Sequence, residues 1–185
     1  KKGIVGGFKE ASGIVVDGDH IVVADAGNSR IQVCTMDGQV VASITHYMDK
    51  ANKKQPILDP TALAMDRDKC LYVLLGSEKR PEDLRTERSI RFVQNALHKS
   101  AFEELPPPRK VIKLRSWKAP ELLAESAPVH TYVTQIAVDA GVSPPLVWVA
   151  NGDGPGSLQQ LSGEDLSLKA QWQDDGATLS NPRQD

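Results

Sequence analysis

Residues 11–44 read ASGIVVDGDHIVVADAGNSRIQVCTMDGQVVASI and contain four short runs of apolar and β-branched residues. The runs are separated by Gly18-Asp19, by residues 26–29 and by Met36-Asp37-Gly38. Glycine, aspartate and asparagine favour turns, and β-branched runs of this length favour strands. The stretch therefore predicts one four-stranded antiparallel sheet in which each strand pairs with the next.

The same order of runs occurs twice more. Residues 60–66 lead to residues 70–74 and later to residues 110–114 and 121–124; residues 133–139 lead to residues 146–151, 156–161 and 166–172. An aspartate ends the first run of each copy, at Asp17, Asp66 and Asp139. Four-stranded sheets leave faces and edges to be covered, and stacking them around an axis is one solution. The sequence therefore predicts an all-β repeat protein.

The first copy resembles the NHL repeat of β-propellers. Gly13 to Asp17, Val23-Ala24-Asp25, Asn28 and Arg30-Ile31-Gln32 follow the order of that family's pattern. The second and third copies depart from it, because Leu75 and Asn151 stand where the first has Asp25. The resemblance implies a fragment of a six-bladed propeller, with about three four-stranded blades. It also implies a structural role for Asp25, Asn28 and Arg30, the arginine pairing with a carboxylate.

The blades are expected at residues 7–47, 58–125 and 130–174, and residues 175–185 resemble the start of a further blade. Propellers close with about four to eight blades, so three blades cannot form a ring. Two explanations remain open. Either the sequence is part of a longer chain, which we favour, or two copies assemble head to tail as a homodimer.

The second blade carries an insertion at residues 76–109. Residues 81–105 lack internal glycine and proline, begin with a proline and acidic residues, and are followed by three prolines, so they predict a helix. Its apolar stripe either packs on the blade or forms a docking face. A candidate binding surface comprises the insertion's arginines and one tyrosine: Arg80, Arg85, Arg88, Arg91 and Tyr132. Acidic residues interleave with the arginines and no aromatic residue alternates with them, so nucleic acid is not an expected partner.

Enzymes similar to NHL propellers carry metal ligands at the central channel. The candidates for such a site are Asn151, Asp153 and His130, with Asp59 and Tyr132 also available, and their oxygen and nitrogen atoms suit Ca²⁺ or another divalent ion. No cofactor is otherwise expected. The sequence has no nucleophile elbow, HExxH, phosphate loop or dinucleotide fingerprint. A metal-dependent hydrolase or lyase, with its other ligands outside this chain, is the alternative to a binding module.

Composition narrows the function further. The formal net charge is −2, from 22 Lys and Arg against 24 Asp and Glu, so no overall field attracts polyanions. No apolar run approaches the length that spans a bilayer. Cys34 and Cys70 are expected to be buried free thiols. The compartment stays open. The sequence favours a propeller module that binds a protein or small ligand.

Overall fold

The computed structural model describes residues 7–76, 109–129, 133–151 and 157–173. They form three four-stranded antiparallel sheets, each a meander of consecutive strands. Blade one contains β1 (Ala11–Asp17), β2 (His20–Asp25), β3 (Arg30–Thr35) and β4 (Val40–Ile44). Blade two contains β7 (Pro60–Met65), β8 (Leu71–Leu75), β9 (Lys110–Leu114) and β10 (Leu122–Glu125). Blade three contains β11 (Val133–Asp139), β12 (Leu146–Asn151), β13 (Ser157–Ser162) and β14 (Leu168–Gln173).

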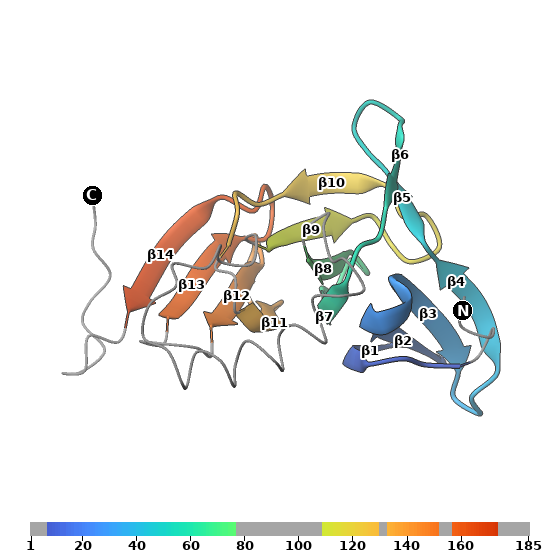
Figure 1. Ribbon diagram of the computed structural model, residues 1–185. Coiled ribbons are helices and arrows are strands. Elements are labelled where there is room, and N and C mark those ends of the chain that lie inside the picture. The colour runs from blue at the N-terminus through green and yellow to red at the C-terminus, as the bar shows by residue number, and fades with distance from the viewer. Residues whose placement is uncertain (1–6, 77–108, 130–132, 152–156, 174–185) are drawn as a thin grey trace, which may run out of the picture.

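The three sheets follow one another along an arc, with blade one at one end and blade three at the other (Figure 1). The first strands of successive blades are neighbours, since β7 contacts both β1 and β11. The prediction of an all-β fold built from repeated four-stranded sheets is confirmed. The sheets have the form of propeller blades.

The blades share one pairing register. Asp25 pairs with Ala11, Leu75 with Pro60, and Asn151 with Val133, and in each blade a one-residue bulge follows that pair. A bulge is a local irregularity that increases twist, and its recurrence shows that the repeat extends to backbone detail. The register gives every residue of a blade an equivalent in the other two. Leu75 and Asn151 therefore occupy the place of Asp25, as the sequence predicted.

Two apolar layers hold the arc together. Val22, Ala24, Ile31 and Val33 of blade one pack against one face of blade two, with all four side chains fully buried. The opposite face of blade two packs against blade three through a second set: Ala62, Tyr72, Leu74, Val111, Ile136, Val147, Val149 and Leu161. Because successive strand residues point to opposite faces, each blade uses alternate residues for its two neighbours.

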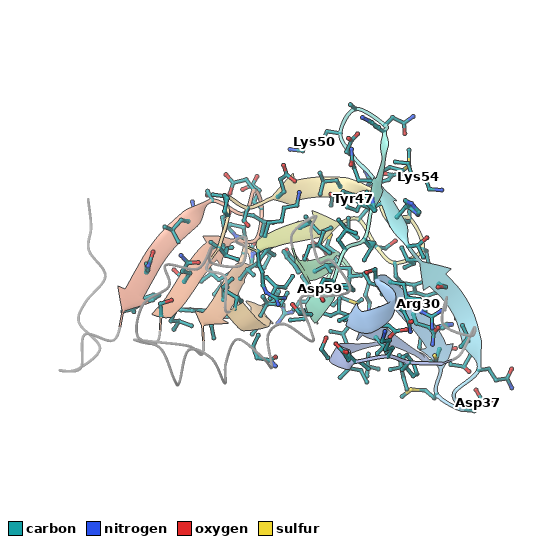
Figure 2. The ribbon with its side chains drawn as sticks, viewed as in Figure 1. Arg30, Asp37, Tyr47, Lys50, Lys54 and Asp59 are labelled. Carbon is teal, nitrogen blue, oxygen red and sulfur yellow. The ribbon has the colours of Figure 1, made fainter. Side chains whose placement is uncertain are left out.

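A two-stranded hairpin lies between blades one and two. It consists of β5 (His46–Met48) and β6 (Lys54–Pro56) and projects from the arc, with Lys50 and Lys54 near its tip and Tyr47 at its base (Figure 2). Asp49 organises the turn, because its carboxylate accepts hydrogen bonds from the amides of Ala51 and Lys53 at 2.9 and 2.8 Å. The sequence did not predict this hairpin.

Other expectations about local structure had mixed outcomes. The predicted helix of residues 81–105 lies outside the described residues. Both cysteines are free; Cys34 is buried, whereas Cys70 is only half-buried. Burial raises the pKa of the Cys70 thiol. In the turn of residues 26–29, Ser29 adopts the left-handed conformation, with φ 48°.

Candidate interaction surface

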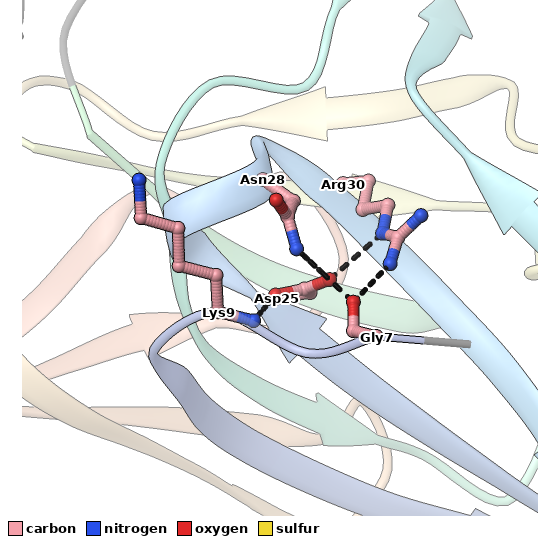
Figure 3. Close-up of polar contacts among 5 residues, drawn as sticks. All are labelled: Gly7, Lys9, Asp25, Asn28 and Arg30. Atoms are coloured by element: carbon pink, nitrogen blue, oxygen red, sulfur yellow. Dashed lines mark hydrogen bonds and ion pairs between the residues drawn. The ribbon is translucent and has the colours of Figure 1, made fainter. Parts of the chain in front are cut away.

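The polar cluster of the first repeat ties the segment before β1 to blade one. Both oxygens of Asp25 are used: Oδ1 accepts the Lys9 amide at 2.7 Å, and Oδ2 accepts Asn28 Nδ2 at 2.8 Å and Arg30 Nε at 2.7 Å (Figure 3). Arg30 also donates to the carbonyl of Gly7 at 2.6 Å. Asp25 is fully buried and Arg30 is nearly so. The expected pairing of Arg30 with a carboxylate is confirmed, and its contacts with Asp25 and Gly7 hold the segment before β1 against blade one.

Blade two holds its own ion pair at the same end. Asp59, directly before β7, lies 3.7 Å from Arg109, directly before β9, and both side chains are mostly buried. Arg109 also donates to the hydroxyl of Thr61. This pair joins the residue that precedes β7 to the point at which the chain returns to blade two before β9. Like the Asp25 cluster, it shapes the blade.

Most of the predicted site residues lie outside the described residues. They are Arg80, Arg85, Arg88, Arg91, Tyr132, His130 and Asp153. Asn151 ends β12, where its backbone pairs with Val133 and Ser157. Within the described part of the chain, no group of three or more His, Cys, Asp or Glu side chains could hold a metal ion. The basic surface and the axial metal site stay predictions.

One sheet face at the start of the arc carries exposed apolar side chains. Ile14 is 64% exposed and Val16 is 57% exposed. By register, Ile14 corresponds to Leu63 in blade two and Ile136 in blade three, which are 6% and 7% exposed. In those blades the preceding blade covers the position. On the same face Val23, Gln32 and Cys34 are buried, so the exposed part lies along β1. We call this part, which carries Ile14, Val16 and Ile21, the blade-one open face.

The opposite end of the arc has a matching open face. Val147 and Val149 of β12 face blade two, so the alternate residues Trp148 and Ala150 face away from it. Trp148 stacks on Trp172 of β14, with ring centroids 5.5 Å apart and planes 26° apart. Trp148 corresponds to Val22 and Tyr72, which are fully buried against the next blade. We call the face that carries Ala137, Trp148, Ala150 and Trp172 the blade-three open face.

Polar contacts join blades one and two at the end where the first strands finish. Trp117, in the turn between β9 and β10, donates its indole N–H to Oδ2 of Asp17 at 2.7 Å. Lys69, in the turn between β7 and β8, lies 3.0 Å from Oδ1 of Asp17. The Lys69 ammonium and the Trp117 indole hold the pKa of Asp17 below its usual value. Asp17, which ends the first strand of blade one, therefore also binds the next blade.

Blades two and three are joined at the equivalent place by a different set of donors. The Tyr72 hydroxyl lies 3.0 Å from Oδ2 of Asp66 and 2.9 Å from the carbonyl of Gly163 in blade three. Lys113 donates to the same carbonyl at 2.7 Å and lies 3.9 Å from Asp66. Here both donors belong to blade two itself. Tyr72 and Lys113 each contact Asp66, and each also donates to the Gly163 carbonyl in a turn of the next blade.

Asp139 of blade three stands at the third equivalent position and is exposed. One oxygen, Oδ1, accepts the amide of Gly141 at 2.8 Å in its own turn. Trp148 and Gln160 occupy the register positions of Tyr72 and Lys113, so blade three supplies no ammonium there. The sequence singled out Asp17, Asp66 and Asp139 by their alignment, but contacts between blades were visible only in the structure.

These features define an all-β repeat protein, whose described residues form an arc of three four-stranded sheets with the form of propeller blades. Residues 8–34, from just before β1 into β3, match the NHL repeat family. The chain thus carries an NHL repeat where the sequence pattern indicated one. No curated protein matches the sequence. Among the described residues, none forms a helix with the length and apolar character needed to cross a membrane.

Two solved structures are similar in part. The computationally designed Ika8 protein aligns with a TM-score of 0.45 and 11% identity over 85% of this chain and 35% of its own. The hydrazine synthase of Kuenenia stuttgartiensis aligns with a TM-score of 0.33 and 10% identity over 82% of this chain and 50% of its own. The present chain therefore spans about a third to a half of the chains that it matches.

Proposed function

We propose that the chain is a binding and scaffold module that works as part of a six-bladed propeller ring, with further blades docking on its two open faces. The observation that carries this is the exposure of Ile14. The position is apolar in all three blades, is buried by the preceding blade in blades two and three, and is 64% exposed in blade one.

Burial of such a face supplies a real driving force. Covering one large aliphatic side chain contributes roughly 1.5–3 kcal/mol, and Val16 lies beside Ile14 on the same strand. Contiguous exposed apolar surface marks interaction sites in soluble proteins. A sheet that already stacks on one neighbour in the same register is suited to a second neighbour of the same kind.

Dye binding tests whether the blade-one open face is an accessible apolar surface. We expect anilinonaphthalene sulfonate to fluoresce with the chain, and the double variant Ile14→Lys with Val16→Lys to lose most of that signal. Val142→Lys is the matched control, because Val142 is an exposed apolar residue in a turn of blade three, 45% exposed and away from blade one. Equal fluorescence from the double variant and the control would contradict the proposal.

A further inference from the structure

The aspartates at the ends of the first strands allow an inference about which blade docks on the blade-three open face. It rests on the proposed function, since it names the occupant of a face proposed there as a docking site. Both junctions inside the chain place polar donors at the aspartate of the earlier blade. The side chain of Asp17 is 17% exposed and that of Asp66 is 4% exposed, whereas Asp139 is an exposed residue.

Charge decides where the donors must come from. In blade two, Lys113 supplies a positive charge near Asp66 and the Tyr72 hydroxyl donates a hydrogen bond to it. Blade one has Val33 and Val22 at those positions, so Asp17 receives its donors from the next blade, through Trp117 and Lys69. Blade three resembles blade one in this respect, because it has no ammonium at these positions, and among the described residues neither Trp148 nor Gln160 donates to Asp139, whose hydrogen bond comes from the Gly141 amide. Asp139 therefore needs donors from the blade that follows, as a carboxylate covered without a partner is costly.

Blade one of a second copy does not supply those donors. The residue of the first turn that corresponds to Lys69 is Asp19, whose carboxylate lies 2.7 Å from the His20 ring and whose side chain is 89% exposed. The turn that corresponds to the Trp117 turn contains Met36, 61% exposed, and Asp37. Asp37 stands at the tip of this turn in Figure 2, and a hydrogen bond from the Thr35 hydroxyl lowers the pKa of its carboxyl. Head-to-tail docking of two copies would bring like charges together.

We infer that the blade docking on the blade-three open face is a four-stranded blade of another sequence, with an indole or ammonium donor in its first or third turn that binds Asp139. The apolar part of its face meets the stacked Trp148 and Trp172. The acidic turns of blade one exclude a second copy from this place, which is how unfavourable contacts give specificity. The homodimer left open by the sequence is thereby disfavoured.

The test converts a second copy into an acceptable partner. We expect the wild-type chain to be monomeric by native mass spectrometry and sedimentation velocity. The double variant Asp19→Lys with Met36→Trp is expected to associate head to tail, and each single variant more weakly. Asp68→Lys is the matched control, because it makes the same charge change at an exposed position in the first turn of blade two, whose two faces are already packed.

Asp139→Asn then identifies the contact. Added to the double variant, Asp139→Asn should weaken association roughly tenfold or more, which is the loss expected for a charge-assisted hydrogen bond. Made in the wild type, the same change should have no effect on association. A wild-type dimer would overturn the inference while leaving the proposed docking function intact. A double variant that associates no more than the control would overturn the donor requirement. Failure of the proposed function itself would appear separately, as dye binding unaffected by changes at Ile14 and Val16.

Discussion

Arg30 is a residue on which the first repeat depends. Its guanidinium binds a carboxylate that is 0% exposed, at 2.7 Å. We expect Arg30→Met to destabilise the chain by about 3–5 kcal/mol, because it leaves the charge of Asp25 buried without its cation. Urea unfolding followed by circular dichroism measures this.

Arg115→Met is the control for that experiment. Arg115 binds Glu121 at 2.8 Å, but both side chains are more than half exposed, so the change should cost no more than about 1 kcal/mol. Similar losses for the two variants would mean that burial of the Asp25 pair does not set its importance.

Asp17 predicts a pH dependence of the contact between blades one and two. Its pKa is lowered in the folded chain by Lys69 and Trp117, so the ionised form is favoured by folding. The resulting stability is fully present above the unfolded value of about 3.9 and is lost as pH falls through the lower folded value. Asp17→Asn should therefore reduce the difference in unfolding free energy between neutral and acid pH.

Asp68→Asn serves as the comparison, since Asp68 is an exposed residue in the turn between β7 and β8. The acid dependence of this variant should match that of the wild type. If Asp17→Asn retains the full acid dependence, the contact with Trp117 and Lys69 does not contribute to it.

At the scale of the elements, the close approach of β1 and β7 leaves no space for a side chain at Gly13. A Cβ atom on Gly13 would lie 2.8 Å from the Cα atom of Ala62 and from the amide nitrogen of Leu63. Both are backbone atoms, so relief requires the strands to separate. Gly13→Ala is expected to cost about 1–3 kcal/mol through overpacking, whereas Ser12→Ala, at the exposed neighbouring position, should change stability by less than about 0.5 kcal/mol. Chemical denaturation of the two variants checks this, and equal effects would contradict it.

The sequence predicted the elements wherever the signal was local. β1 to β4 follow from β-branched runs and turn residues that are adjacent in the chain, and Arg30 meets a carboxylate only five positions away. The hairpin of β5 and β6 escaped prediction because Lys54-Gln55-Pro56 has no apolar alternation. The contacts between blades escaped it for a different reason: Trp117 is 100 positions from Asp17, and Gly163 is 91 positions from Tyr72.

At the scale of the whole molecule, the same repeat position should respond in opposite ways in different blades. Leu63→Lys should unfold blade two or cost more than about 4 kcal/mol, because Leu63 is 6% exposed between two blades and a buried ammonium has no partner there. Ile14→Lys, at the corresponding position of blade one, should change stability by less than about 0.5 kcal/mol. Thermal and urea unfolding of both variants measures the contrast. A large loss from Ile14→Lys would show that its face is already covered.

Blade two also shows how much additional chain a blade accepts. Residues 76–109 stand between β8 and β9 where blade one has only residues 26–29, yet Leu75 pairs with Lys110 as Asp25 pairs with Arg30. Because the entropy of closing a loop grows only with the logarithm of its length, the longer connection costs roughly 2 kcal/mol more. In evolutionary terms, the connection between β8 and β9 is a place where segments can be gained, lost or exchanged while the sheet keeps its register, so new surfaces can be acquired without redesigning the blade.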